Sequence, residues 1–360
     1  MSEDPNKPLP EFGSMMHLFY PERAGVEEPM PFARGLLFGN GRQALLALYA
    51  ARLLPAGRLW VPDYFCPEVL ASWETFVGEI RTYPFGPWSK ELKIADIPAQ
   101  DGDTVLLLNT LGLFGQPDLG SLQQRGVMVV EDHSHDPFSP WATASNADWC
   151  VASLRKSLPL PDGGVLWSPA GHRLPEAPTL SAAHELAAGR VFAAMALKRD
   201  YLFGGFPPKS LFRQLYLEGD AGVIATTLSS ITPTTKGLLA RFPHAAWRRQ
   251  RQANWQRLAQ AWDGVGVLRV ATPKHSEAVP FGVVLLLPDQ SSRNRLRAAL
   301  QAAQFYTAIL WELASVQGAA PGAESRAFSQ RHLVVACDGR YREVDLEAMT
   351  RLVLEEAGRL

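Results

Sequence analysis

The sequence has few of the features that mark secreted, membrane or nucleic-acid-binding proteins. Only three cysteines occur in 360 residues, at Cys66, Cys150 and Cys337, and their odd number and wide spacing argue against a disulfide framework. No apolar run approaches the roughly 20 residues that a membrane helix requires. Lysine plus arginine (35) nearly equals aspartate plus glutamate (36). We therefore expect neither a nucleic-acid nor a membrane partner.

The first residues, MSEDPNKPLPEFG, lack the basic start and apolar centre of a signal peptide. Internal repeats and low-complexity tracts are also missing. Apolar residues make up 47% and charged residues 20% of the chain, which is ordinary for a globular protein. We therefore expect a cytoplasmic, enzyme-sized protein whose length suits two domains.

From residue 34 to 168, short apolar runs alternate with stretches of helical periodicity. TVLLLNTL (104–111) and VMVVED (127–132) are typical of buried parallel strands, whereas QALLALYAARLL (43–54) has helical spacing. This alternation predicts an α/β fold with a mainly parallel sheet between helices. Further strands are predicted at 58–65, 80–85, 149–154 and 163–168, and further helices at 67–77 and 119–126.

The pattern of apolar and polar residues changes in the second half of the chain. Residues 176–262 are rich in helical patterns, and 244–262 form a long amphipathic helix whose basic face we expect to be solvated. After Gly264, apolar runs at 265–271 and 278–288 and helices at 291–305 and 343–358 predict a smaller α+β domain. We expect an N-terminal arm (1–30), a large domain (31–250) and a small C-terminal domain (251–360).

Three stretches contain candidate ligand-binding or catalytic residues. Gly39, Asn40 and Gly41 directly precede the helix at 43–54. Glycines permit a close backbone approach, and the free N–H groups of a helix start attract a phosphate. A Gly-Asn-Gly turn that merely caps a helix is the simpler alternative. The stretch is not a dinucleotide fingerprint, because no G-x-G-x-x-G follows a strand here.

The second stretch, VVEDHSHDPF (129–138), places ionisable residues directly after a buried strand. His133 and His135 suggest a metal site, but no third histidine or cysteine stands at a clear ligand spacing, and we predict no metal. Asp132 instead ends a parallel strand, where open α/β sheets place their ligand sites. Glu131, His133 and Asp136 are expected to serve structure or to face solvent.

The third stretch, VASLRKSLPLPDGG (151–164), places Ser153 and Lys156 between a buried strand and a tight turn. Partial desolvation there would favour the free amine of Lys156, the form that Schiff-base chemistry requires. An ordinary surface lysine is the alternative. Taken together, an anion-binding helix start, a strand-end aspartate and a strand-end lysine are the three partners that pyridoxal 5′-phosphate (PLP) needs.

The chain resembles the DegT-like sugar aminotransferase family, in the aspartate aminotransferase (type I) PLP fold. The resemblance runs in order through GNGRQALLALYAARLL, LWVPDYFCPEVLASW, LFGQPDL, VVEDHSHD and ASLRKSLPLPDGG, and then through FYTAILW and SQRHLVVACDGRYREVDLEAM. It implies a large domain with a mainly parallel seven-stranded sheet, a smaller C-terminal α+β domain and a homodimer.

The resemblance also implies roles for matching residues. Lys156 would form the Schiff base and move the proton between substrate and cofactor, and Asp132 would keep the pyridine nitrogen protonated. His135 stands where the family has glutamine, beside the phenolic oxygen. The remaining cofactor contacts would come from the helix start, where Arg42 replaces a threonine, from a serine and from a stacking aromatic ring: Asn40, Gly41, Arg42, Ser153 and either Tyr64 or Phe65.

Several positions depart from the family pattern. Ser153 and Lys156 are only three residues apart, where the family spacing is Ser-Phe-x-x-x-Lys, and Cys66 falls where the stacking aromatic is often found. The asparagine-bearing stretch that reaches the neighbouring subunit has no clear counterpart, and Asn254 is a distant candidate. These departures keep two alternatives open: a catalytically idle binding or scaffold protein, and a PLP-dependent lyase or dehydratase.

The resemblance implies small-molecule substrates. An amino acid, glutamate in our expectation, would donate the amino group to a keto or aldehyde acceptor such as a nucleotide-linked keto sugar. Trp311, Arg340 and Tyr341 are candidates for the substrate side of the pocket or for packing.

Overall fold

The computed structural model describes residues 7–19, 30–73, 76–313 and 321–360. Seven strands form the largest sheet: β2 (Leu36–Phe38), β3 (Leu59–Pro62), β4 (Ile80–Tyr83), β5 (Thr104–Leu108), β6 (Met128–Asp132), β7 (Trp149–Ser153) and β8 (Gly164–Trp167). Their order is β2-β8-β7-β6-β5-β3-β4. The five strands from β7 to β4 run parallel, whereas β8 is antiparallel to both of its neighbours. The predicted mainly parallel sheet is confirmed.

The central strands are buried on both faces, as their continuous apolar runs predict. All five residues of β5 are buried. Because side chains alternate along a strand, Val105 and Leu107 pack into one apolar core and Leu106 and Leu108 into the other. Short helices and turns connect the strands: α1 (Gly41–Ala50), α2 (Pro67–Trp73), η1 (Ile94–Asp96), η2 (Thr110–Gly112), α3 (Gly120–Gln123), α4 (Pro140–Ala144) and α5 (Leu154–Ser157).

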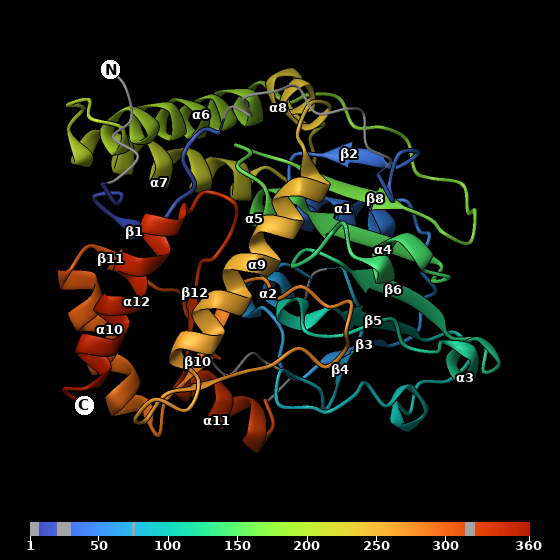
Figure 1. Ribbon diagram of the computed structural model, residues 1–360. Coiled ribbons are helices and arrows are strands. Elements are labelled where there is room, and N and C mark those ends of the chain that lie inside the picture. Colours follow the sequence, from blue (N-terminus) through green and yellow to red (C-terminus); the bar gives the residue numbers. More distant parts are fainter. Residues whose placement is uncertain (1–6, 20–29, 74–75, 314–320) are drawn as a thin grey trace.

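Four helices follow the sheet: α6 (Ala182–Leu202), α7 (Lys209–Ala225), α8 (Pro233–Leu239) and α9 (His244–Trp262). α6 and α7 form a helical hairpin, and α9 runs between the large sheet and the C-terminal elements (Figure 1). The expectation of a solvated basic face on α9 is wrong for two of its arginines. Arg251 is buried, and Arg248 and Arg251 both bind the buried carboxylate of Asp136.

The C-terminal elements surround a second, smaller sheet in the order β12-β10-β9. The elements are β9 (Arg269–Val270), β10 (Val283–Leu286), α10 (Gln290–Ala302), β11 (Phe305–Tyr306), α11 (Ala323–Arg331), β12 (His332–Val335) and α12 (Glu343–Ala357). Their apolar core includes Leu9 and Phe12 from the other end of the chain. β1 (Phe12–Gly13) pairs with β11 in parallel.

The expected domain limits agree only in part with the elements of the structure. Of the N-terminal arm, residues 1–6 and 20–29 lie outside the described residues, and residues 7–19 pack on the C-terminal elements and on α6. The expected division between residues 250 and 251 falls inside α9.

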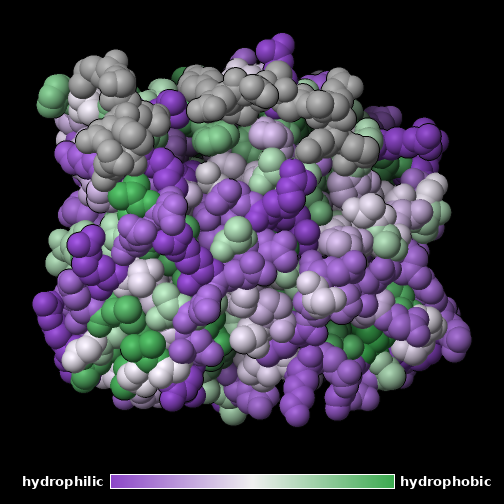
Figure 2. All heavy atoms as spheres, viewed as in Figure 1, coloured by the Kyte–Doolittle hydropathy of each residue, from purple (hydrophilic) through white to green (hydrophobic). Residues whose placement is uncertain are grey.

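The outer surface offers few apolar patches on the face seen in Figure 2. Hydrophilic side chains dominate that face, and the apolar areas between them are small and separate (Figure 2). Among the residues described, no helix has both the length and the apolar character required to cross a bilayer.

Candidate active site

Asp132 and Ser153 are the last residues of β6 and β7, so both lie at the carboxyl edge of the large sheet. Ser134 links them. Its backbone N–H donates to Oδ1 of Asp132 at 2.8 Å, and its Oγ accepts from the N–H of Ser153 at 2.8 Å. Oδ2 of Asp132 and Oγ of Ser153 have no hydrogen-bond partner among the described residues. The edge therefore presents one free carboxylate oxygen and one free hydroxyl.

The start of α1 lies against the end of β7. A Cβ added to Gly41 would lie 2.9 Å from Cβ and 3.0 Å from Cα of Ser153, so only glycine permits this approach. Asn40 is used within the fold, because its side chain accepts the N–H of Gln43 at 3.0 Å and donates to the carbonyl of Val223 at 2.8 Å. The structure thus brings together the predicted phosphate-binding residues Gly41 and Ser153.

Two arginines near this edge are paired with carboxylates. Arg42 lies 3.6 Å from the exposed carboxylate of Glu68, and Arg155 pairs with Asp220. An exposed ion pair of the first kind contributes less than about 1 kcal/mol. An anion bound at the start of α1 would therefore compete with Glu68 for Arg42 at little cost.

Lys156 extends from the one-turn helix α5 that follows Ser153. Its Nζ lies 5.8 Å from the centroid of the Trp311 ring. No carboxylate or carbonyl of the described residues binds it. The amine is thus available to a ligand.

His135 has one ring nitrogen in use and one free. Nδ1 accepts the N–H of Leu111 at 3.1 Å, so in the neutral ring the proton is on Nε2. Nε2 is buried and has no partner among the described residues. Burial, and then the positive charge of Lys156, lowers the pKa of His135 well below its usual value, which keeps the ring neutral. Such an orphaned donor costs about 1–3 kcal/mol and is suited to a ligand acceptor.

The two aromatic residues predicted to stack on the cofactor lie behind a third. Tyr64 is fully buried, and its hydroxyl accepts the N–H of Trp311 at 2.9 Å. Phe65 stacks on Trp73 inside the core. Trp311 contacts both, with its ring centroid 5.6 Å from that of Tyr64 and 6.3 Å from that of Phe65. Of these three rings, that of Trp311 lies beside the Lys156 amine and lines the cavity with it.

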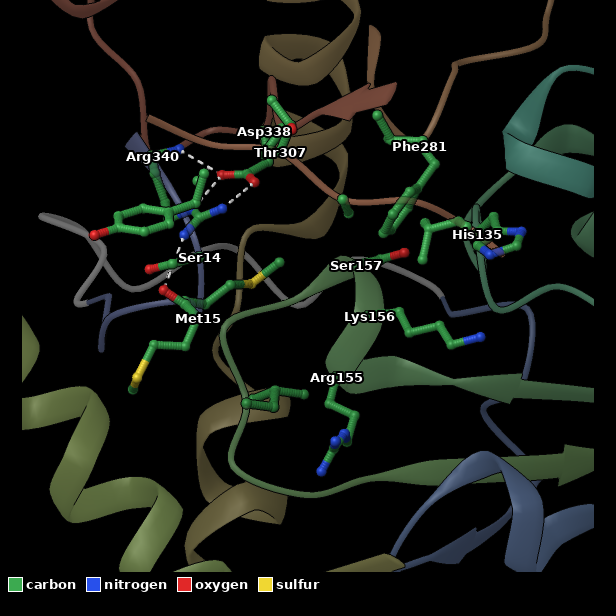
Figure 3. Close-up of a pocket in the computed structure, with 18 of the residues that line it drawn as sticks. Ser14, Met15, His135, Arg155, Lys156, Ser157, Phe281, Thr307, Asp338 and Arg340 are labelled. Atoms are coloured by element: carbon green, nitrogen blue, oxygen red, sulfur yellow. Dashed lines mark hydrogen bonds and ion pairs between the residues drawn. The ribbon is translucent and has the colours of Figure 1, made fainter. Parts of the chain in front are cut away.

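A cavity of about 390 Å³ opens beside Lys156 and His135. Figure 3 shows these two residues at one end and Arg340, Asp338, Ser14 and Met15 at the other. The lining joins four parts of the chain: the N-terminal segment (Gly13, Ser14, Met15, Met16), the end of the large sheet (His135, Arg155, Lys156, Ser157, Leu160, Pro161), the long helices (Val191, Met195, Tyr216, Arg251) and the C-terminal elements (Phe281, Tyr306, Thr307, Ala308, Leu310, Trp311, Val334, Ala336, Asp338, Arg340).

The far end of the cavity is built around a buried ion pair. Arg340 donates to Asp338 through Nε at 2.7 Å and Nη2 at 2.8 Å. Asn254, the distant candidate for a partner-reaching residue, donates to the carbonyl of Asp338 at 2.9 Å and is buried. Tyr341 does not line the cavity, and its hydroxyl accepts the N–H of Gly13 at 2.9 Å.

The N-terminal segment is a part of the site that sequence reasoning missed. Lys198 of α6 holds it through hydrogen bonds from Nζ to Oγ of Ser14 and to the carbonyl of Met15, both at 2.6 Å. Lys198 also pairs with Glu11 at 2.9 Å. A buried lysine that is paired and hydrogen-bonded is expensive to displace, so this segment forms a fixed wall. No local motif marks it, since it follows a Pro-rich start.

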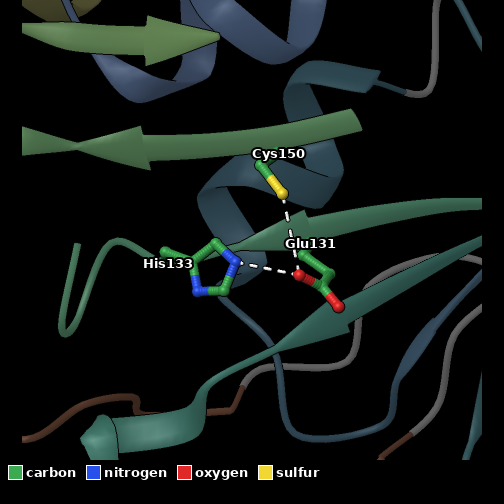
Figure 4. Close-up of side chains that lie close together, drawn as sticks. All are labelled: Glu131, His133 and Cys150. Atoms are coloured by element: carbon green, nitrogen blue, oxygen red, sulfur yellow. Dashed lines mark hydrogen bonds and ion pairs between the residues drawn. The ribbon is translucent and has the colours of Figure 1, made fainter. Parts of the chain in front are cut away.

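A second polar cluster lies on the opposite face of β6. His133 Nε2 is 3.0 Å from Oε2 of Glu131, and the thiol of Cys150 lies 3.6 Å from the same oxygen (Figure 4). All three side chains are buried. The fold therefore supplies the third possible metal ligand, which spacing in the sequence could not reveal. Ser145 Oγ lies 3.3 Å from Cys150 Sγ, whereas Oε1 of Glu131 and Nδ1 of His133 are buried without a hydrogen-bond partner among the described residues.

Comparison with known proteins shows the fold. No protein-family profile matches the chain, and no curated protein sequence does. The putative sugar aminotransferase Spr1654 from Streptococcus pneumoniae, in its apo form, matches with a TM-score of 0.63 and 11% identity, over 90% of this chain and 86% of that chain. DesV from S. venezuelae, in complex with a ketimine intermediate, matches with a TM-score of 0.59 and 16% identity, over 91% and 85%.

A third solved structure is similar over the same extent. The 3-amino-5-hydroxybenzoic acid synthase matches with a TM-score of 0.58 and 16% identity, covering 91% of this chain and 87% of that chain. The chain thus has the fold of these proteins across both the large sheet and the C-terminal elements. The fold predicted from the sequence is confirmed.

Proposed function

We propose that the protein is a PLP-dependent aminotransferase. The observation that carries the proposal is a set of groups without protein partners at one edge of the sheet. They are the Lys156 amine, the buried Nε2–H of His135, the Ser153 hydroxyl and Oδ2 of Asp132. These four groups match four parts of PLP. The amine matches the aldehyde, the neutral Nε2–H matches the phenolic oxygen, the hydroxyl beside the helix start matches the phosphate, and the carboxylate matches the ring nitrogen.

Each residue would then have a distinct task. Gly41, Arg42 and Ser153 would hold the phosphate at the start of α1, Asp132 would pair with the protonated ring nitrogen, and His135 would donate from Nε2 to the phenolic oxygen. Asn40 would act indirectly, since its side chain caps α1. When bound, PLP supplies an electron sink for negative charge that develops on the substrate carbon.

Lys156 would bind the aldehyde carbon and then serve as the general base. With a substrate amine in its place on the cofactor, Nζ would be a free amine that could take up a proton from the substrate carbon and return it. The neutral ring of His135 adds no positive charge beside Nζ. The same lysine would serve in both half-reactions.

We assign the covering aromatic ring to Trp311 in place of Tyr64 or Phe65. The Trp311 ring lies 5.8 Å from Nζ of Lys156 and 5.7 Å from the ring of His135. Tyr64 would then position Trp311 through its hydroxyl. Phe65 would support the same ring from the core.

The reaction would move an amino group from an amino acid, glutamate in our proposal, to a keto or aldehyde acceptor. Similar structures support a sugar acceptor, such as a nucleotide-linked keto sugar, because Spr1654 is described as a putative sugar aminotransferase and DesI was solved with its TDP-sugar product. Spr1654 also has PLP and PMP forms, the two cofactor states that a two-step amino transfer requires.

A homodimer in the cytoplasm is part of the proposal. Three free cysteines suit a reducing compartment. Exposed apolar side chains gather near the helical hairpin, which a second copy would cover. Of nine exposed large hydrophobic residues among those described, six lie on or beside it: Leu186, Phe206, Leu211, Leu217, Ile224 and Leu228.

Absorption spectroscopy on the purified protein tests the proposal. We expect a visible cofactor band that L-glutamate bleaches and a keto acid restores. Lys156→Ala should lose the band, whereas Lys236→Ala, at an exposed lysine of α8, should keep it. Failure of the protein to bind PLP would favour an idle binding protein. Loss of water from a substrate without amino transfer would favour a lyase or dehydratase.

A further inference from the structure

The charges around the cavity do not balance. Four cationic residues and one acidic residue line it: Arg155, Lys156, Arg251, Arg340 and Asp338. Arg340 is neutralised by Asp338, and Arg155 is neutralised by Asp220 behind it. Lys156 and Arg251 remain. The proposed function gives Lys156 a role in binding the cofactor. It gives no role to Arg251, the other cation of the cavity wall.

Arg251 is buried, with 2% of its surface exposed. Its Nη2 donates to Oδ1 of Asp136 at 2.7 Å, but Nε is buried without a partner. Asp136 also accepts from Arg248, through Nε at 3.0 Å and Nη2 at 2.9 Å. Two guanidinium groups thus share one carboxylate, and a net positive charge is left beside the cavity. A buried cation with unused donors is costly unless an anion joins it.

We propose that Arg251 binds a carboxylate group of the substrate. The inference rests on the proposed function, which places the reacting carbon at Lys156, on the lining of the same cavity. Arginine is suited to this task because its charge is permanent and its donors lie in one plane, like the oxygens of a carboxylate. The phosphate of the cofactor would bind at Gly41 and Ser153, on a different part of the carboxyl edge of the large sheet, and so does not need Arg251.

The rest of the cavity fits a small organic acid. Leu160, Met195 and Phe281 supply apolar wall between the charged residues, and the whole space is about 390 Å³. In a cavity with such a lining, the charge of Arg251 would determine the orientation of the ligand. Either the amino donor or the acceptor could bring the carboxylate, and the experiment separates these two sources.

Arg248 provides a matched control for Arg251. Both arginines bind the same carboxylate from the same helix, but only Arg251 lines the cavity. Arg251→Met and Arg248→Met each leave Asp136 with one guanidinium partner, so both variants should fold. Arg251→Lys keeps the charge and serves as a further variant if Arg251→Met does not fold.

Calorimetry with succinate, a dicarboxylate that does not react, tests the proposal on the cofactor-loaded protein. We expect Arg251→Met to lose at least about tenfold in succinate affinity, roughly the effect of one charge-assisted hydrogen bond. Arg248→Met should stay within about threefold of the original protein, and uncharged succinamide should bind at least about tenfold more weakly than succinate. Equal succinate affinity in Arg251→Met and the original protein, or no succinate binding at all, would overturn the proposal.

The cofactor band in the same samples separates this inference from the proposed function. Loss of the band in every sample means that the proposed function has failed. A normal band with succinate binding indifferent to Arg251 means that only the present inference has failed. If Arg251→Met also raises the L-glutamate concentration needed to bleach the band, the carboxylate is that of the donor; if that concentration is unchanged while succinate affinity falls, it is that of the acceptor.

Discussion

The backbone N–H of Leu111 donates a 3.1 Å hydrogen bond to Nδ1 of His135 and so determines which nitrogen of the neutral ring holds the proton. Leu111 has a positive φ of 55°, a conformation that is costly for a bulky residue. This strained conformation in the loop after β5 accompanies the hydrogen bond from Leu111 N–H to Nδ1. Because Nδ1 is the acceptor, Nε2–H of His135 remains free beside the cavity. Strained backbone of this kind is often found at functional sites.

Substitution of His135 is the first prediction. His135→Phe keeps a ring but removes the Nε2 donor, so we expect PLP affinity to fall by about 10- to 100-fold, the equivalent of about 1.5–3 kcal/mol for a hydrogen bond to a charged group. His135→Gln restores a side-chain N–H and should recover most of the affinity. The dissociation constant of PLP, measured by absorbance titration, distinguishes the two variants.

The thermal midpoint of each variant provides the control. Both substitutions lose the acceptor for the N–H of Leu111 in its present position, so a purely structural role would lower the midpoint without separating Phe from Gln in cofactor affinity. Equal PLP affinity in His135→Phe and the original protein would refute the assignment of the donor.

The contact between Gly41 and Ser153 leads to the second prediction. In Gly41→Ala, the new methyl group would lie 2.9 Å from Cβ of Ser153 and would push α1 away from β7. We expect both a lower stability and at least about tenfold weaker binding of inorganic phosphate and PLP, because the helix start is where the phosphate would bind. Calorimetric titration with each ligand measures the effect.

Gly237 of α8 is the matched glycine. A Cβ there meets nothing within 4 Å, and alanine favours the helix by up to about 1 kcal/mol. Gly237→Ala should therefore be neutral or stabilising and should leave phosphate binding unchanged. If Gly41→Ala binds phosphate as well as Gly237→Ala does, the start of α1 is not the phosphate site.

Much of the fold could be predicted because the signals for it are local. The Val/Leu runs of β5 and β6 and the helical spacing of α1 and α12 each depend on neighbouring residues. The positions of Gly41, Asp132 and Ser153 at the edge of the sheet could be predicted for a related reason. Each stands where an element begins or ends, and the carboxyl edge of a parallel sheet gathers such positions.

The rest of the site depends on contacts between distant segments. Ser14 and Met15 reach the cavity only because β1 joins β11, and a Pro-rich N-terminal segment shows no sign of this. Trp311 lies in front of Tyr64 because two loops about 250 residues apart meet there. Arg251 looked like one more basic residue on an amphipathic helix, and only its position opposite Asp136 distinguishes it.

The third prediction concerns pH and the buried His332. Its Nδ1 donates to the carbonyl of Phe328 at 2.8 Å and its Nε2 accepts from the N–H of Leu310 at 2.9 Å. Burial lowers the pKa of His332 to about 4. Because the unfolded chain takes up this proton near pH 6.5 and the folded chain only near pH 4, stability is full above pH 6.5 and falls as the pH drops toward 4.

The size of this effect can be measured. A difference of about 2.5 pH units corresponds to about 3 kcal/mol. We expect His332→Gln, which keeps one donor and one acceptor and does not titrate, to be less stable at pH 8 but to lose about 3 kcal/mol less between pH 7 and pH 4. Urea unfolding at each pH gives both values. A parallel loss of stability in the two proteins would show that His332 does not titrate as described.

The final prediction addresses the Glu131–His133–Cys150 cluster, which we interpret as an ion pair rather than a metal site. Burial alone would raise the pKa of Glu131, but the hydrogen bond and charge of His133 outweigh it, and the pKa is lowered. The pair therefore stabilises the fold above the ordinary pKa of a glutamate, and this contribution is lost as the pH falls below it.

Two substitutions separate the ion pair from a metal site. His133→Ala leaves the buried carboxylate of Glu131 without its hydrogen-bond partner and should cost about 3 kcal/mol or more of unfolding free energy. Cys150→Ala removes only a weak S–H donor, and we expect it to cost less than about 2 kcal/mol. A zinc ion would need the thiolate as much as the imidazole, so the two losses would then be similar and a chelator would reproduce them. Urea unfolding with and without EDTA, together with elemental analysis of the purified protein, decides between the two, because an ion pair predicts unequal losses that the chelator leaves unchanged.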